Sequence, residues 1–272
     1  MTSAILAASK LPPICVLAVQ IEQPDEKWNA MMTERKKNID VFDQDVASKG
    51  GYLYTDQARL SSRLANARIS GAILSALDFA GQRVVDLGCG DGSYTVEIAH
   101  AGVRHVTGID PAAGAIEMAR KRALEFGAGN SEFAIYSLYD LPSSMDDTFD
   151  IAVLRGVLHH LSDPAKAVAI ALHLARRVVI LEPNGLNPVL KLIERTSQYH
   201  IEHEEQSFTP SSAARWCRKA GAHSVHWSFL GLTPMFCPDW MARTCSLAEP
   251  VIEKIPGLRS ISCGQYVMVA ER

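Results

Sequence analysis

The chain has 272 residues, 47% of them hydrophobic, and a formal net charge of −3. This length and composition suit a globular protein with a full core and do not require two domains. The slightly negative charge argues against a nucleic-acid-binding protein, which needs a basic surface.

The chain contains six cysteines and no C-x-x-C pair. This usage indicates reduced thiols in a cytoplasmic protein rather than a disulfide framework. Two apolar runs, at residues 4–8 and 14–21, are well short of the roughly 20 apolar residues that span a bilayer. We therefore expect no membrane association and no signal peptide, and we assign residues 14–21 to a strand or packing segment.

Two helices are expected next, at residues 26–46 and at about residues 56–79, because apolar residues recur there at helical spacing. Tyr52 and Tyr54 lie between them, after a pair of glycines. These tyrosines could contact the substrate as part of a lid, or they could be ordinary packing aromatics. We assign residues 1–57 to an N-terminal segment with a helical lid.

Strands and helices then alternate. Strands are expected at residues 84–87, 105–109, 132–136, 151–154 and 178–181, with helices at residues 93–101, 112–126 and 164–175. This alternation predicts an α/β fold with a doubly wound, mostly parallel sheet, right-handed crossovers and helices on both faces.

The later part of the chain is expected to complete the same domain, which spans residues 58–272. A helix is expected at residues 209–220, and two strands at residues 224–230 and 265–270 form an antiparallel hairpin. Two insertions interrupt this pattern. Residues 186–206 predict one or two helices, and residues 231–258, which contain several prolines, predict an irregular segment.

A glycine-rich turn follows the first strand of the alternating region, with the sequence DLGCGDG at residues 86–92. Glycine has no Cβ, so the backbone can turn sharply and a ligand can lie against it. The spacing differs from the G-x-G-x-x-G of dinucleotide-binding proteins because Ser93 occupies the next position. The turn predicts a cradle for a nucleoside-type cofactor.

The DLGCGDG segment resembles the first motif of class I S-adenosylmethionine-dependent methyltransferases. Three later segments agree with that family in the same order: GIDP at residues 108–111, YDLP at residues 139–142, and FDIAVL to LHHL within residues 149–161. The resemblance covers residues 60–184 well. It implies a seven-stranded Rossmann-like sheet, S-adenosylmethionine as the cofactor, and methyl transfer. The similarity is greatest to the broad small-metabolite group, so we expect a small-molecule O, N or C acceptor, with a role in specialised metabolism.

Ligands of open parallel sheets bind outside the carboxyl ends of the strands, where the strand order reverses. The candidate cofactor-binding residues there are Asp86, Gly88, Cys89, Gly90, Asp110, Pro111, Ser137, Leu138 and Arg155. The resemblance implies that Asp86, or a water beside it, faces the methionine ammonium, although Asp86 could instead bond the amides of its own turn. Asp110 follows the second strand, where an acid can hold both ribose hydroxyls. It could also cap a helix that begins at Pro111.

The family often has an acid after the third strand that contacts the adenine, but the aligned position here is Ser137. Its hydroxyl could bond the base, and Leu138 could cover the face of the ring. Arg155 and Glu182 end the fourth and fifth strands. Arg155 could bind the carboxylate of the cofactor, or it could form a salt bridge with Glu182.

Two histidines follow the fourth strand and are the candidate catalytic residues. Histidine can accept a proton near neutral pH, and the resemblance places His160 at the edge of the active site, so we prefer it to His159 as a base. His200 and His203 have the spacing of two ligands on one helical face, but no third ligand with suitable spacing is visible. We therefore predict no metal.

Two other functions remain open. One is an NAD(P)-dependent oxidoreductase, and the other is a non-catalytic partner protein that binds S-adenosylmethionine. The sequence leaves the oligomeric state undecided, with a homodimer as one option.

Overall fold

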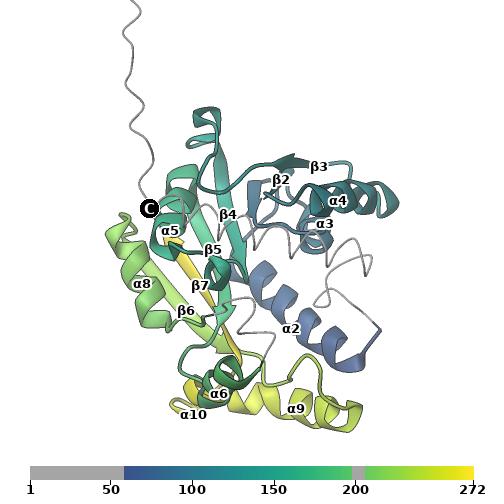
Figure 1. Cartoon of the computed structure of the whole chain (residues 1–272), viewed down its shortest axis with the longest axis vertical. Coiled ribbons are helices and arrows are strands. Elements are labelled where there is room, and N and C mark those ends of the chain that lie inside the picture. The colour runs from purple at the N-terminus through teal and green to yellow at the C-terminus, as the bar shows by residue number, and fades with distance from the viewer. Residues whose placement is uncertain (1–57, 198–205) are drawn as a thin grey trace, which may run out of the picture.

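The computed structural model describes residues 58–197 and 206–272, and its centre is a seven-stranded sheet (Figure 1). The strands are β1 (Arg83–Leu87), β2 (His105–Asp110), β3 (Ser131–Ile135), β4 (Phe149–Arg155), β5 (Ala175–Pro183), β6 (Ser224–Leu230) and β7 (Gln265–Glu271). The helices are α2 (Leu60–Ala76), α3 (Ser93–His100), α4 (Ala113–Glu125), α5 (Pro164–Leu174), α6 (Pro188–Thr196), α8 (Pro210–Lys219), α9 (Asp239–Ile252) and α10 (Leu258–Ser262), with short 3-10 turns η2 (Ser143–Met145) and η3 (Leu158–His160).

The strand order is β3-β2-β1-β4-β5-β7-β6. The first five strands in this order pair in parallel, whereas β7 pairs antiparallel with both β5 and β6. The strand order reverses between β1 and β4. These two strands are parallel, so their carboxyl ends lie together at one end of the sheet. The predicted doubly wound sheet with a C-terminal antiparallel pair is confirmed.

Alternate residues of the strands point to opposite faces of the sheet, and each face has its own apolar core. On one face, Val85 and Ile180 belong to a cluster that includes residues of α5 and α8. On the other face, Val84 and Val179 belong to a cluster that includes residues of α2 and α3. Helices therefore cover both faces, with α5 and α8 on one side and α2, α3 and α4 on the other (Figure 1).

Local sequence signals set the ends of two helices. The Asp163 carboxylate caps α5 by accepting from the amide of Lys166, and the Thr209 hydroxyl caps α8 by accepting from the amide of Ser212. A proline occupies the first turn of each helix, where no hydrogen bond is lost. Gly221 follows α8 with a φ of 98°, which confirms the predicted stop.

The prediction that residues 231–258 are irregular is wrong, because this segment contains α9. Three of its four prolines lie outside the helix: Pro234 and Pro238 precede it, and Pro256 follows it. Only Pro250 lies inside the helix. The segment is tied to the domain by Glu249, which is 5% exposed and accepts hydrogen bonds from the Leu232 and Thr233 amides and the Thr233 hydroxyl.

Several expectations lie outside the described residues. These are the strand or packing segment at residues 14–21, the helix at residues 26–46, the lid assigned to residues 1–57, and the middle of the insertion at residues 186–206. The described part of that insertion contains α6. The domain boundaries stay a prediction.

Candidate active site

A cavity of about 1060 Å³ lies at the carboxyl ends of the parallel strands. All the predicted site residues that the structure describes line this cavity, with the exception of Asp86. The walls come from three regions: the strand ends with the turns that follow them, α2 with α6 and α9, and the segments 206–208 and 231–237. The cavity is therefore the candidate active site.

The glycine turn forms one wall of the cavity and has the backbone that only glycine adopts easily. Gly88, Gly90 and Gly92 have φ angles of 78°, 53° and 74°. A Cβ on Gly88 would lie 2.7 Å from a methyl carbon of Val157, so the turn packs directly against the segment after β4. The amides of Gly88 and Cys89 both donate to the Ile109 carbonyl, which fixes the turn to the end of β2.

Asp110 joins the glycine turn to the segment after β2. One carboxylate oxygen accepts from the Gly90 amide at 3.0 Å, and the other accepts from the Ala112 amide at 2.9 Å. Asp110 does not cap a helix that begins at Pro111, because α4 begins two residues later, at Ala113. Asp110 and Pro111 both line the cavity.

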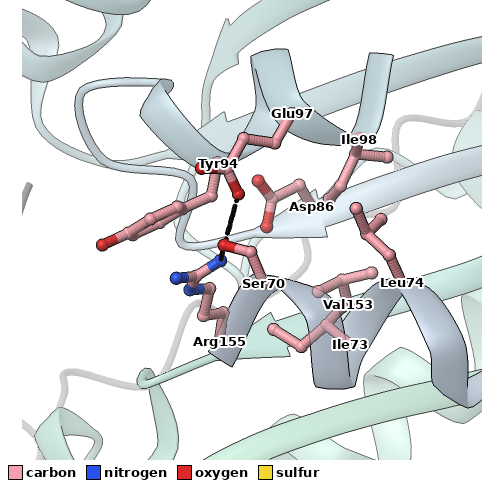
Figure 2. A pocket seen from close by; sticks show the side chains of 9 residues that line it. All are labelled: Ser70, Ile73, Leu74, Asp86, Tyr94, Glu97, Ile98, Val153 and Arg155. Atoms are coloured by element: carbon pink, nitrogen blue, oxygen red, sulfur yellow. Dashed lines mark hydrogen bonds and ion pairs between the residues drawn. The ribbon is translucent and has the colours of Figure 1, made fainter. Parts of the chain in front are cut away.

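Asp86 lies behind the glycine turn rather than on the wall of the main cavity. It is 3% exposed, and its carboxylate accepts from the Thr95 hydroxyl at 2.6 Å. Burial raises the pKa of this carboxyl to about 6, although the Thr95 hydrogen bond and the charge of Arg155 act in the opposite direction. Asp86 borders a second, water-sized cavity of about 10 Å³ (Figure 2).

Arg155, at the end of β4, borders both cavities (Figure 2). Its Nη1 donates to the Ser70 hydroxyl at 2.9 Å and lies 3.6 Å from the Glu97 carboxylate. Its guanidinium carbon lies 3.2 Å from the ring centroid of Tyr94. Nη2 is buried and has no hydrogen-bond partner among the residues that the structure describes. The alternative salt bridge to Glu182 does not form, since each of the two has other partners.

Glu182, at the end of β5, is fully buried and holds the segment that carries the two histidines. One oxygen accepts from the amides of Val157 and Leu158, at 2.9 and 2.7 Å. The other lies 2.8 Å from Nδ1 of His159. With its carboxylate fixed by two amides, Glu182 favours the tautomer in which Nδ1 of His159 is protonated and Nε2 can accept a proton.

His160, the preferred base in the sequence analysis, also lines the cavity, with its ring centroid 3.9 Å from that of His159. The carboxylate partner nevertheless belongs to His159. No local sequence pattern indicates this pairing, because a strand residue 23 positions away supplies the carboxylate.

Ser137 and Leu138 follow β3 and line the cavity, and their contact with the adenine stays a prediction. The Ser137 hydroxyl accepts from the Tyr139 amide at 3.3 Å, and Leu138 is 8% exposed. Cys89 is also nearly buried, and burial raises the pKa of its thiol well above the usual range. It therefore contributes shape rather than a reactive thiolate.

Sequence analysis missed Asn66 and Tyr94. Asn66 is 2% exposed, lines the cavity from α2, and accepts a hydrogen bond from the Tyr94 hydroxyl at 2.7 Å. A buried asparagine in the apolar stripe of a helix was the available signal, because such a group needs a polar partner.

Other candidate residues cannot be placed. Tyr52, Tyr54, His200 and His203 lie outside the described residues. Within residues 58–197 and 206–272, no cluster of three or more His, Cys, Asp or Glu side chains could hold a metal ion. In the same residues, no helix has both the length and the apolar character needed to cross a bilayer.

Comparison with known proteins identifies the family. A family model described as a methyltransferase domain matches residues 78–223, which is more than half of the chain. The chain belongs to the S-adenosylmethionine-dependent methyltransferases. The matched segment holds the glycine turn, Asp110, Arg155, both histidines and Glu182, so the methyl donor is S-adenosylmethionine.

Relatives of this methyltransferase include a ubiquinone biosynthesis O-methyltransferase of Aromatoleum aromaticum. The two are 29% identical over 170 residues, which cover 57% of this chain and 70% of the relative. A second ubiquinone biosynthesis O-methyltransferase, from Neisseria meningitidis, is 30% identical over 155 residues, which cover 53% of this chain and 65% of the relative.

A solved structure similar to this methyltransferase is a possible histamine N-methyltransferase of Thermotoga maritima. Its TM-score is 0.62 at 16% identity, covering 86% of this chain and 99% of the other. This likeness extends the shared fold over most of the chain. A likeness at this level of identity shows the fold alone, and the fold does not select the acceptor.

Proposed function

We propose that this methyltransferase acts on a hydroxyl group of a small molecule, with His159 as the base. The observation that carries the proposal is the 2.8 Å contact between Nδ1 of His159 and the buried Glu182 carboxylate. An alcohol or phenol must lose its proton as it is methylated, whereas a neutral amine already has a free electron pair. A histidine held by a carboxylate suits proton removal. The names of the relatives, which are O-methyltransferases, agree with this choice.

The residues present fit S-adenosylmethionine. Asp110 lies on the cavity wall at the end of β2, where a carboxylate can accept from the ribose hydroxyls. The glycine turn leaves room for the ligand, and Leu138 provides an apolar surface for the adenine. The buried Nη2 of Arg155 lacks a partner among the described residues and would bind the methionine carboxylate. The Tyr94 ring lies against the Arg155 guanidinium, and the Tyr94 hydroxyl donates to Asn66.

Bound S-adenosylmethionine supplies an electrophilic methyl group on a positively charged sulfur. The walls of the cavity hold the acceptor hydroxyl in line with that group, and orientation of this kind can lower a barrier by roughly 7–11 kcal/mol. His159 takes the hydroxyl proton at Nε2 while Glu182 stabilises the resulting imidazolium. Methyl transfer to the hydroxyl oxygen would leave the sulfur as a neutral thioether, so the proton of the acceptor hydroxyl is the one that His159 must accept.

The test is to incubate the full chain with isotope-labelled methyl donor and a metabolite extract, and to find labelled products by mass spectrometry. We expect a labelled methyl ether. With that acceptor, the His159→Ala variant should lose at least about 100-fold in turnover because the base is absent, while its affinity for S-adenosylhomocysteine stays unchanged.

His173→Ala is the matched control, since His173 is exposed on α5 and pairs only with Asp146 among the described residues. It should keep wild-type turnover. Labelled amines as the sole products, or full turnover by His159→Ala, would contradict the proposal.

A further inference from the structure

The cavity has two halves that differ in their polar groups. The donor half comprises Asn66, Tyr94 and the cavity residues at the ends of β1 to β4. It includes Asp110 and Arg155, which are proposed to bind S-adenosylmethionine. The acceptor half comprises the cavity residues of α6 and α9, the segments 206–208 and 231–237, Gly264 and Gln265. Nothing in the donor site requires the polar groups of the acceptor half.

The acceptor half is mainly apolar. Its apolar side chains are Leu190, Ile193, Phe208, Met235, Phe236 and Met241. Among its described residues, Glu194 is the only Asp, Glu, Lys or Arg. An acceptor that binds against these side chains loses its contact with water. Binding is therefore favourable for apolar groups and unfavourable for a charge that finds no partner.

The charge of Glu194 is already compensated. One carboxylate oxygen accepts from the Ser207 amide at 3.1 Å and the other from Lys191 Nζ at 2.9 Å. Lys191 also donates to the Ser207 carbonyl at 2.8 Å. Burial raises the pKa of Glu194, but the bonds from Ser207 and Lys191 outweigh it and hold the pKa below its usual range. Neither charge is therefore left to bind an ionised acceptor.

Two uncharged polar groups in this half make no hydrogen bond of normal geometry in the part of the chain that the structure describes. They are Gln265 Oε1 and the Ser207 hydroxyl, both buried. The Ser207 hydroxyl also lies near enough to Glu194 to lower the pKa of that carboxyl, and its oxygen can still accept from a ligand. Ser207 as a whole is only 6% exposed. A buried polar atom without a partner is destabilising, so a ligand that supplies the partner binds more tightly.

Sheet register places these two groups on either side of the end of β5. Gln265 pairs with Pro183, and Phe208, next to Ser207, forms a bridge with Asn184. Glu182, which holds His159, directly precedes these positions. Both groups line the same cavity as His159, and the Gln206 amide, next to Ser207, donates to the His159 carbonyl at 3.4 Å. An acceptor held by these groups can therefore be oriented toward that histidine.

We infer that the methyl acceptor is an uncharged, largely apolar molecule whose hydrogen-bonding group is held by the Ser207 hydroxyl and the Gln265 amide. The inference rests on the proposed function, and it adds the charge of the acceptor and two specificity-determining residues. Within residues 58–197 and 206–272, the acceptor half offers no free charge to pair with a carboxylate, a phosphate or an ammonium ion.

Three probes of nearly equal shape test the inference: naphthylmethanol, naphthylmethylamine and naphthoate. At pH 7 they are neutral, positively charged and negatively charged. Binding to the full chain is measured by calorimetry, with and without S-adenosylhomocysteine. We expect the alcohol to bind at least about tenfold more tightly than either charged probe. Equal binding of a charged probe, or no binding of the alcohol up to its solubility limit, would overturn the inference.

Variants then test the two residues. Gln265→Leu and Ser207→Ala should each weaken binding of the alcohol about threefold to tenfold and leave the affinity for S-adenosylhomocysteine unchanged. Gln265→Glu keeps the size of the side chain and adds a negative charge, so the amine should gain affinity relative to the alcohol. Ser211→Ala, on the exposed side of α8, is the matched control. Wild-type binding of the alcohol by both Gln265→Leu and Ser207→Ala would count against the inference.

The same titrations separate this inference from the proposed function. Failure to bind S-adenosylhomocysteine would contradict the proposed donor site. The relative affinities of the three probes, measured without S-adenosylhomocysteine, would still test the acceptor half. Conversely, normal binding of S-adenosylhomocysteine with a preference for a charged probe would remove this inference alone.

Discussion

Asp110 has two duties at once, since it holds the glycine turn and is proposed to hold the ribose. We predict that Asp110→Ala lowers the affinity for S-adenosylhomocysteine at least about tenfold, because each hydrogen bond to a charged group contributes roughly 1.5–3 kcal/mol. Asp110→Asn can still accept a hydrogen bond from one amide, so its affinity for S-adenosylhomocysteine should lie between those of the wild type and Asp110→Ala. Calorimetry measures the effect, and Asp140→Ala, an exposed acid outside the cavity wall, is the control. Unchanged affinity in Asp110→Ala would disprove the assignment.

Asp86 should make stability depend on pH. Its pKa in the folded protein is about 6, against 3.8 for the ordinary group, so the folded state holds the proton more tightly than the unfolded state. The carboxyl therefore destabilises the fold progressively as the pH rises from about 4 to 6, by a total of about 3 kcal/mol. Asp86→Asn removes this cost and can still accept from Thr95.

Urea unfolding of the wild type and Asp86→Asn at several pH values measures this dependence. Relative to the variant, the wild type should lose stability across that window and change little above it. A constant difference between the two proteins from pH 4 to 7 would show that the carboxyl titrates normally.

At the scale of elements, α9 fixes the loop at residues 231–237 that lines the acceptor half. The Glu249 carboxylate satisfies three donors of that loop. We predict that Glu249→Ala lowers the free energy of unfolding by about 1–3 kcal/mol, because those donors lose their acceptor. The same variant should also raise the KM for the acceptor. Its affinity for S-adenosylhomocysteine should change by a smaller factor.

Chemical unfolding and steady-state kinetics measure the two effects. Glu249→Gln, whose amide oxygen can still accept, should retain most of the stability, and Glu125→Ala, exposed at the end of α4, should match the wild type. Equal losses in Glu249→Ala and Glu125→Ala would show that α9 does not hold the loop.

The elements also show what sequence could predict. Strands β1 to β5 are short apolar runs between clear turns, so hydrophobic pattern and glycine placement located them. The helix α9 was missed because prolines at its borders resemble loop composition, and only the three-dimensional partners of Glu249 explain its position. The pairing of His159 with Glu182 and the partners of Arg155 depend on which strands become neighbours, and no local pattern encodes them.

For the whole molecule, ligand binding should separate the family's cofactor from a nicotinamide cofactor. S-adenosylhomocysteine at about 100 times its Kd should stabilise the folded protein by about 2.7 kcal/mol. For a protein of this size, that corresponds to a rise in Tm of roughly 5–10 °C. NADH at the same concentration should leave Tm unchanged. Thermal unfolding with each ligand provides the measurement, and a rise with NADH alone would favour an oxidoreductase.

The position of β7 has a consequence for how the molecule assembles. This strand lies between β5 and β6, and β6 joins the sheet only through it. Until β7 is inserted, β5 and β6 both present open backbone edges, which are templates for association with other chains. Because the partners of β7 in β5 are far away in sequence, this step closes a long loop and is expected to come late. Newly synthesised chains would then be most prone to aggregate just before that strand docks.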